Sequence, residues 1–211
     1  MNADFVQILN FLHKAEALKR ELRHSWLSNG RQESVAEHSW RMSLMGILLI
    51  PYIKQKINIA HLLQMIICHD LVEIEVGDLP RPLRPDKVEK LKQERTGMNK
   101  LVKQLPNKLG DKINQLWEEF ESGASNEAKL AQALDKMEVV IQHNEADIST
   151  WSKKNNEYGL NLHGQDKAVS KVIDLVLFNK HVYQECRQKI MDEGLDVKEF
   201  EKEWEEFKDK F

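Results

Sequence analysis

The 211-residue chain is poor in the residues that interrupt helices, with only nine glycines and five prolines. Proteins built from many short strands need frequent turns, and those turns use glycine and proline heavily. Long helices therefore suit this composition better than a sandwich or barrel of strands. Because the sequence also has no internal repeat and no inter-domain linker, it predicts an all-α fold, a single-domain helical bundle over residues 1–211.

The chain also lacks a cysteine framework, a long apolar run and an excess of one charge. Its two cysteines, Cys68 and Cys186, are far apart and form no CxxC motif. The most apolar stretch, residues 44–53, is about half as long as a membrane-spanning helix and contains Pro51. A net charge of −3 gives no reason to expect nucleic-acid binding, and residues 1–20 do not resemble a signal peptide. These absences predict a cytoplasmic protein that binds neither membranes nor nucleic acids.

Apolar residues recur at helical spacing along most of the chain. The expected helices cover residues 4–22, 35–50, 59–76, 86–104, 108–121, 126–152, 165–192 and 196–210. Ser34 is expected to cap the second of these, because Glu37 three residues later completes a capping box. Residues 59–76 are hydrophobic on nearly every face, which predicts the central buried helix. The polar residues 28–32 and the proline-rich residues 78–85 predict loops.

Three polar residues, His69, Asp70 and Glu73, interrupt the apolar pattern of the expected central helix. An unpaired polar group or charge is costly to bury, so these residues need a reason. His69 and Asp70 would lie about 100° apart around a helix, close enough for their side chains to reach one metal ion. Glu73 lies one turn beyond Asp70, within range of a water molecule on that ion.

His38 and Asp135 are candidates for two further ligands from other expected helices. His38 lies near the start of the second helix, and Asp135 lies beside an apolar stripe in residues 130–141. Imidazole and carboxylate groups together suit Mn²⁺, Fe²⁺, Co²⁺, Ni²⁺ or Zn²⁺. Ligands from three helices leave coordination positions open, as a catalytic site requires. A solitary histidine or aspartate is usually structural or solvent-exposed, so the prediction depends on the four residues as a set.

With these residues in view, the sequence resembles the HD-domain phosphohydrolases, whose metal ligands follow the order H…HD…D. It is most similar to the 5′-deoxynucleotidase branch of bacteria and its HD-domain-containing relatives. The matching segments are ESVAEHS at residues 33–39, HDLVE at residues 69–73 and GDLP at residues 77–80. The resemblance covers about residues 5–185 and implies an HD-type helical bundle, and the helix expected over residues 196–210 lies beyond that span.

The resemblance implies a role for each matched residue. One divalent metal ion per chain (Mn, Co, Fe, Ni, Zn or Mg) would be held by His38, His69, Asp70 and Asp135. Glu73 would position or deprotonate the attacking water. The substrate's sugar would face Asp78 and the backbone of Leu79 and Pro80. The resemblance also implies a homodimer.

The family's Arg-Trp pair, which precedes the first histidine ligand, is incomplete in this chain. In the family the arginine orients the phosphate, and the tryptophan excludes a ribose 2′-hydroxyl. An alignment without gaps puts Arg23 at the arginine position but His24 at the tryptophan position. A shift of two residues recovers Trp26 and then puts Ser25 where the arginine should be. Selection for deoxyribose is therefore left open, and either Arg23 or Arg31 would balance the phosphate charge.

The function predicted from the sequence is removal of the 5′-phosphate from ribo- or deoxyribonucleoside monophosphates by a metal-activated water. Within the enzyme class, the alternative is a hydrolase of nucleoside triphosphates or guanosine tetraphosphate. Outside that class, the alternative is a non-catalytic HD protein that binds a metal or a nucleotide. The presence of Glu73 and Asp78 favours an enzyme, because metal binding alone needs neither residue.

Two further features have more than one interpretation. Residues 81–112 contain ten Lys or Arg against four Asp or Glu, which could steer an anionic nucleotide or could form a solvated helix face. The second feature is an aromatic stripe at helical spacing, which must be buried either on its own bundle or in a homodimer contact. Its members are Phe200, Trp204, Phe207 and Phe211.

Overall fold

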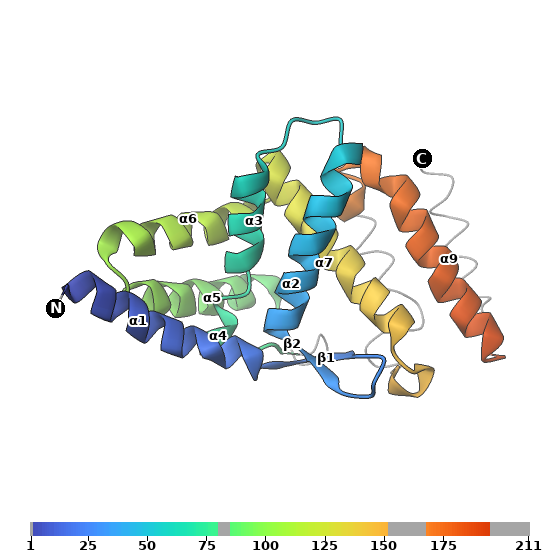
Figure 1. Ribbon diagram of the computed structural model, residues 1–211, viewed down its shortest axis with the longest axis horizontal. Helices are drawn as coiled ribbons and strands as arrows, with labels where there is room; N and C mark the ends of the chain where they lie inside the picture. Colours follow the sequence, from blue (N-terminus) through green and yellow to red (C-terminus); the bar gives the residue numbers. More distant parts are fainter. Residues whose placement is uncertain (1, 80–84, 152–167, 195–211) are drawn as a thin grey trace.

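The computed structural model describes residues 2–79, 85–151 and 168–194 (Figure 1). Its described part consists of helices and one small antiparallel hairpin, which confirms the predicted all-α class. The α-helices are α1 (Ala3–Ala15), α2 (Val35–Leu49), α3 (Ile59–Cys68), α4 (Glu73–Val76), α5 (Lys87–Val102), α6 (Asn107–Ser122), α7 (Asn126–Glu145) and α9 (Val176–Asp192). The short 3₁₀ helices are η1 (Glu16–Lys19), η2 (Ile50–Tyr52), η4 (Ile148–Thr150) and η6 (Ile173–Leu175). The hairpin strands are β1 (Leu22–Trp26) and β2 (Gln32–Ser34).

The hairpin replaces the end of the first expected helix. The helix predicted over residues 4–22 ends at Ala15, and η1 then leads into β1. Along β1 the buried positions are Arg23 and Ser25, whereas Leu22 is exposed. A half-buried strand is normally recognised by apolar residues on its inner face, and here the inner face is polar. The prediction of a long first helix was therefore wrong. The predicted loop at residues 28–32 falls between the two strands except for Gln32, which begins β2.

The start of α2 follows the predicted capping box. Ser34 Oγ accepts a hydrogen bond from the backbone N–H of Glu37 at 3.3 Å. Glu37 Oε2 in turn accepts from the backbone N–H of Ser34 at 2.9 Å. These two bonds satisfy donors that a helix N-terminus otherwise leaves unpaired, so they define where α2 begins and place His38 in its first turns.

The predicted central helix over residues 59–76 is broken in two. α3 ends at Cys68, a turn covers residues 69–72, and α4 then runs to Gly77, whose φ of +73° stops it. At the break, His69 Nδ1 donates to the carbonyl of Ile66 at 2.6 Å, which competes with the backbone bond that would continue the helix. One face of α3 also reaches solvent, where Ile67 is 60% exposed. The prediction of one uninterrupted, fully buried helix was therefore wrong.

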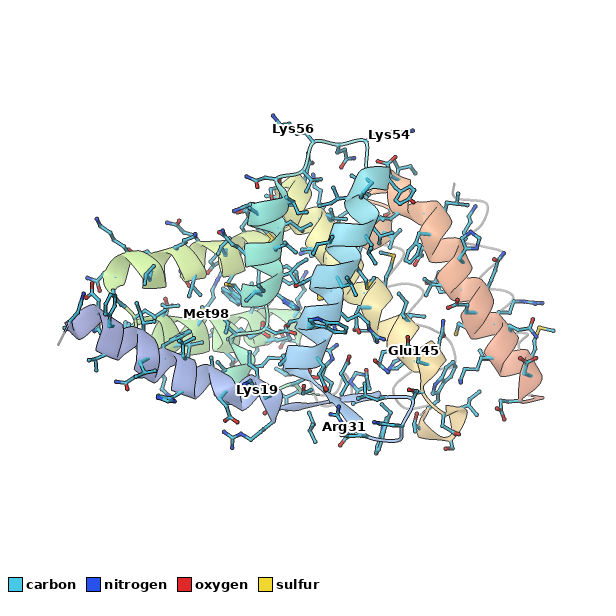
Figure 2. The ribbon with its side chains drawn as sticks, viewed as in Figure 1. Lys19, Arg31, Lys54, Lys56, Met98 and Glu145 are labelled. Carbon is cyan, nitrogen blue, oxygen red and sulfur yellow. The ribbon has the colours of Figure 1, made fainter. Side chains whose placement is uncertain are left out.

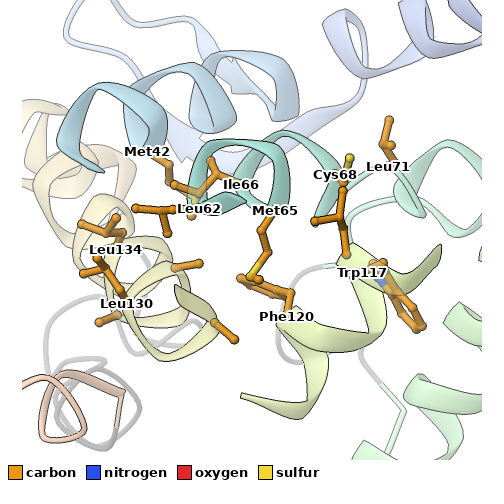
Figure 3. Packing of buried hydrophobic residues seen from close by; sticks show 14 of the residues in the cluster. Met42, Leu62, Met65, Ile66, Cys68, Leu71, Trp117, Phe120, Leu130 and Leu134 are labelled. Carbon is orange, nitrogen blue, oxygen red and sulfur yellow. The ribbon is translucent and has the colours of Figure 1, made fainter. Parts of the chain in front are cut away.

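The hydrophobic core lies between α2, α3, α6 and α7, with α3 packed against the other three (Figures 1 and 3). Its fully buried members include Met42, Leu62, Met65, Ile66, Leu130 and Leu134. A second, smaller cluster packs α7 against α9 through Val140, Val182, Tyr183, Cys186 and Ile190. Because α7 takes part in both clusters and also contacts β1, it is the helix around which the described part of the bundle is arranged.

The later helices agree with the predicted order but not with every predicted end. α5, α6 and α7 begin within one residue of the expected positions, whereas α7 ends at Glu145 and not at residue 152. The helix expected over residues 165–192 is interrupted: residues 168–169 are helical, a turn and η6 follow, and α9 begins at Val176. The helix expected at residues 196–210, with its aromatic stripe, lies outside the described residues. None of the helices in the described ranges is long and apolar enough to cross a membrane.

Two helical glycines allow a matched test of this packing. A Cβ at Gly110 in α6 would lie 2.6 Å from the backbone oxygen of Val102, whereas a Cβ at Gly46 in α2 would lie 3.4 Å from Leu62 Cδ2. We predict that Gly110→Ala lowers the free energy of unfolding by about 1–3 kcal/mol through overpacking. Gly46→Ala should be neutral or raise it by up to about 1 kcal/mol, because alanine is the better helix former. Urea unfolding monitored by circular dichroism measures both, and equal stability of the two variants would contradict the packing of α5 against α6.

Candidate metal centre and active site

Four side chains from three separate segments converge in the bundle. His38 comes from α2, His69 and Asp70 come from the turn after α3, and Asp135 comes from α7. His38 Nε2 lies 3.3 Å from Asp135 Oδ1 and 3.9 Å from Asp70 Oδ2. His69 Nε2 lies 3.1 Å from Asp70 Oδ2. Side-chain atoms of His38, His69 and Asp135 all lie within 4.8 Å of one another, so the structure brings together all four residues expected to bind metal.

Both histidine rings are oriented by contacts on the side away from this cluster. The Nδ1 atom of His69 donates to the carbonyl of Ile66, and the Nδ1 atom of His38 is hydrogen-bonded to the carboxylate of Glu138. In each ring the other nitrogen, Nε2, therefore faces the cluster. This is the arrangement that histidine metal ligands have in proteins, where the second nitrogen is tied to a carbonyl or a carboxylate.

Three polar atoms at the centre of the cluster are buried without a hydrogen bond among the described residues. They are His38 Nε2, His69 Nε2 and Asp70 Oδ2. Buried polar atoms are nearly always hydrogen-bonded or bound to an ion, because leaving them unsatisfied is costly. Two imidazole nitrogens and two carboxylates form a donor set that fits a divalent ion. The residues present therefore fit a metal site.

The electrostatics of the cluster also favour a bound cation. Burial and the nearby Arg23 lower the pKa of His38, but Glu138 and Asp135 outweigh them and raise it to about 10. Burial raises the pKa of Asp135, but Lys136 and His38 outweigh burial and hold that pKa well below its usual value. The carboxylates thus attract positive charge to this point, either as a proton on His38 or as a metal ion that displaces it.

Glu73 and Asp78, the two residues predicted to be catalytic, come shortly after His69 and Asp70 in the sequence. Glu73 opens α4, and its Oε2 atom is buried without a hydrogen bond among the described residues. Burial, together with the negative charges of Asp70 and Asp78, raises the pKa of Glu73 to about 10. Asp78 follows the left-handed Gly77, and its backbone N–H donates to Glu21 Oε1 at 2.9 Å. Leu79 is exposed, and Pro80 lies outside the described residues.

The structure separates the three residues considered for phosphate binding and for exclusion of a ribose hydroxyl: Arg23, Trp26 and Arg31. Arg23 is buried beside the cluster, with Nη1 3.5 Å from Asp70 Oδ2. Trp26, at the other end of β1, accepts a hydrogen bond from Gln142 Nε2 through its carbonyl at 2.6 Å. Arg31 lies at the exposed edge of the hairpin, where its guanidinium donates to Glu37 at 2.6 and 3.1 Å (Figure 2). The contacts that Arg31 makes with Gln32 and Glu37 thus lie outside the four-residue cluster.

Three charged residues in this region were not predicted from the sequence: Glu33, Arg41 and Glu138. Glu33 lies 3.3 Å from Arg23 Nε, and Arg41 Nε donates to Glu138 Oε1 at 2.7 Å. Glu138 is flanked by Met137 and two valines in an apolar stretch of the helix. The argument that singled out His69, a polar residue in an apolar helix, applies equally to Glu138 and would have found it.

Comparison with known proteins places this bundle and its buried histidine–aspartate cluster in a family. The family model described as the HD domain matches residues 15–176, so the chain belongs to the HD-domain family. The human protein 5′-deoxynucleotidase HDDC2 is 32% identical over 140 residues, which are 65% of this chain and 67% of the relative. The 5′-deoxynucleotidase hdd1 of Schizosaccharomyces pombe is 33% identical over 168 residues, 72% of this chain and 83% of the relative. The resemblance predicted from the sequence is confirmed.

Solved structures agree with this assignment. A predicted metal-dependent phosphohydrolase from Magnetospirillum magnetotacticum MS-1 superposes with a TM-score of 0.74 at 26% identity, covering 89% of this chain and 94% of the other. An HD-domain phosphohydrolase from Listeria innocua superposes with a TM-score of 0.70 over 97% of this chain and 99% of the other. At 15% identity, the second likeness supports the fold alone.

A buried histidine behind the hairpin makes stability depend on pH. His143 on α7 has its Nε2 atom 3.4 Å from Ser25 Oγ. Burial, assisted by the nearby His24, lowers the pKa of His143 to about 3. The side chain of a histidine in an unfolded chain has a pKa near 6.5. Between these two values the unfolded state binds a proton that the folded state does not, so folding is favoured less as the pH falls.

We predict that the free energy of unfolding decreases as the pH falls from about 6.5 towards 3, with His143 contributing up to about 1.4 kcal/mol per pH unit. His143→Gln should reduce this slope, measured by urea unfolding at a series of pH values. His13→Gln, which removes an exposed histidine of α1, is the control and should keep the wild-type slope. Equal slopes in all three proteins would contradict the burial of a neutral His143.

Proposed function

We propose that the chain is a metal-dependent phosphohydrolase that removes the 5′-phosphate from nucleoside monophosphates. The observation that carries the proposal is the set of buried, unsatisfied atoms on His38, His69 and Asp70, which face one another beside Asp135. The names of the relatives, which are 5′-deoxynucleotidases, support the choice of substrate. A homodimer and a cytoplasmic location stay predictions from the sequence.

His38, His69, Asp70 and Asp135 would together hold one divalent ion per chain. Their donor atoms leave the choice between Mn, Co, Fe, Ni, Zn and Mg open. When bound, such an ion lowers the pKa of a coordinated water and withdraws electrons from a phosphoryl oxygen. The other steps are assigned to side chains around the cluster.

Glu73 would take the proton of the water that attacks phosphorus. Its buried Oε2 atom has no other hydrogen-bond partner among the described residues, and its helix starts directly after the turn that carries Asp70. A cation in the cluster opposes the effect of Asp70 and Asp78 on the pKa of Glu73, so ion binding favours the ionised form that can accept a proton. Unlike the four proposed ligands, Glu73 is not needed to bind the ion, which favours an enzyme over a non-catalytic metal-binding protein.

Arg23 would bind the phosphate oxygens of the substrate. Its guanidinium already lies beside Asp70, and arginine is always charged and recognises phosphate through paired hydrogen bonds. Asp78, with the backbone of Leu79 and Pro80, would face the sugar. We leave Arg31 out of this site, because it is exposed and its guanidinium pairs with Glu37 and not with a residue of the cluster.

The first prediction of this proposal concerns metal content. Wild-type protein should bind about one divalent transition-metal ion per chain, and His69→Ala and Asp70→Ala should lose ion and phosphatase activity together. Chelation should lower the melting temperature of the wild type, because an ion that binds only the folded state stabilises it. Elemental analysis and Mn²⁺ titration measure the stoichiometry. His61→Ala, a histidine of α3 paired with Glu119, is the control and should bind metal normally.

Two tightly bound ions per chain would contradict the single centre. Wild-type affinity in either cluster variant would remove that residue from the ligand set.

The second prediction concerns Glu73→Gln. Glutamine keeps the size of the side chain but cannot accept the proton, so kcat should fall by about 10²–10⁴ with normal metal content and little change in KM. The control is Glu75→Gln two residues later, which weakens ion pairs to Lys14 and Lys100 and should affect stability but not kcat. Metal loss in Glu73→Gln would make Glu73 a ligand, and an unchanged kcat would remove it from the mechanism.

A screen across mono-, di- and triphosphates identifies the preferred phosphoester.

The third prediction concerns the sugar. Because His24 stands at the family's tryptophan position, we predict that kcat/KM favours dAMP over AMP by less than about 100-fold, or about 2.7 kcal/mol. Trp26→Ala should leave this ratio nearly unchanged. A stronger deoxy preference that Trp26→Ala abolishes would show that Trp26 excludes the ribose hydroxyl despite its shifted position.

A further inference from the structure

Glu138 contacts His38 on the side opposite the four-residue cluster. It lies one helical turn after Asp135 on α7, and its carboxylate is hydrogen-bonded to His38 Nδ1. The side chains of both His38 and Glu138 are 0% exposed. His38 is thus held between two carboxylates of the same helix, with Asp135 at Nε2 and Glu138 at Nδ1.

The chemistry of a carboxylate decides which nitrogen of His38 carries hydrogen. An ionised carboxylate has no hydrogen to donate and can only accept, so Nδ1 of His38 must be the donor in this bond. In the neutral ring the lone pair then resides on Nε2, which faces Asp70 and Asp135 at 3.9 and 3.3 Å. A histidine metal ligand needs this arrangement, in which the second nitrogen fixes the tautomer and the direction of the first.

Arg41 holds Glu138 in place. Its Nε donates to Glu138 Oε1 at 2.7 Å, and its Nη1 reaches Glu145 Oε2 at 2.5 Å near the solvent. Because Arg41 is three residues after His38 on α2, both side chains bind Glu138 from the same helix. The Glu138 carboxylate therefore has both oxygens engaged, one by His38 and one by Arg41, and has little freedom to turn.

The same contacts explain a second group of potential metal-binding atoms in this region. Glu33, His38 and Glu138 also offer atoms within 4.8 Å of one another. Two guanidinium groups already supply positive charge there, since Arg23 lies 3.3 Å from Glu33 and Arg41 lies 2.7 Å from Glu138. Two buried carboxylates balanced by two arginines leave no excess negative charge for another cation. Glu33, His38 and Glu138 therefore do not form a second metal site. Within this group, Glu138 holds His38 at the proposed metal centre.

We propose that Glu138, held by Arg41, is a positioning residue that sets the tautomer and orientation of His38 and so the metal affinity of the cluster. The inference rests on the proposed function, because it takes His38 to bind the ion through Nε2.

The test is the Mn²⁺ affinity of purified, metal-depleted protein. Glu138→Gln keeps the volume of the side chain but removes the charge that the His38 Nδ1–H and Arg41 share, so the Kd for Mn²⁺ should rise about 10–100-fold. The matched control is Glu145→Gln, which removes a half-exposed carboxylate from the same arginine and should change the Kd by less than about fivefold. The two variants separate a general loss of Arg41 contacts from loss of the contact to His38.

A double-mutant cycle separates positioning from a merely structural role. If Glu138 acts through His38, then Glu138→Gln should weaken Mn²⁺ binding no further in a His38→Ala background. An equal loss in both backgrounds would overturn the inference, as would an unchanged Kd for Glu138→Gln alone. If the wild type itself binds no Mn²⁺, the proposed function fails and this inference fails with it. If only the Glu138 results disagree, the proposed function stands.

A measurement on the wild type tests the inference even if Glu138→Gln does not fold. In ¹⁵N-labelled, Zn²⁺-loaded protein, nuclear magnetic resonance of the histidine rings reports which nitrogen carries hydrogen and which binds the ion. The expected result for His38 is hydrogen on Nδ1 and the ion on Nε2. A ring that binds the ion through Nδ1, or that carries hydrogen on Nε2, would overturn the inference.

Discussion

The fit of His38 between two carboxylates of α7 is the interaction on which the rest of the structure depends. His38 is fully buried, with Asp135 at one ring nitrogen and Glu138 at the other. A buried charge without a partner destabilises a fold strongly, so α2 and α7 can pack only when these charges are matched. Arg41 completes the match on the Glu138 side. On the Asp135 side the unsatisfied atoms remain, and there a bound cation would serve both stability and chemistry.

The broken helix at residues 69–72 is the second consequence of building this site inside a helical bundle. A continuous helix would carry His69 and Asp70 at fixed angles set by the helix alone. The bond from His69 Nδ1 to the Ile66 carbonyl instead accompanies a change to a tight turn, and both side chains then face His38. The turn also starts the short helix α4, which opens with Glu73. The helix is thus interrupted at residues 69–72, which carry two of the proposed metal ligands.

Much of the fold follows from local sequence, and its exceptions have identifiable physical causes. Capping residues and apolar periodicity predicted α2, α5 and α6 closely, since these features act within one helix. The hairpin was not predictable in this way, because the inward positions of β1 are Arg23 and Ser25. Polar residues beside apolar stripes, together with the resemblance to the HD-domain phosphohydrolases, predicted which four residues come together. The hydrogen bond from Arg41 to Glu138 joins residues that are 97 positions apart in the sequence. A pattern within a single helix cannot reveal a contact between residues so far apart in the chain.

The central claim, that the four converging side chains form one metal centre, is tested most directly by crystals grown with Mn²⁺ and measured for anomalous scattering. The account predicts one strong anomalous peak per chain, about 2.0–2.3 Å from Nε2 of His38 and His69 and from carboxylate oxygens of Asp70 and Asp135. A peak held by other residues, or no peak in this cluster at saturating Mn²⁺, would contradict it.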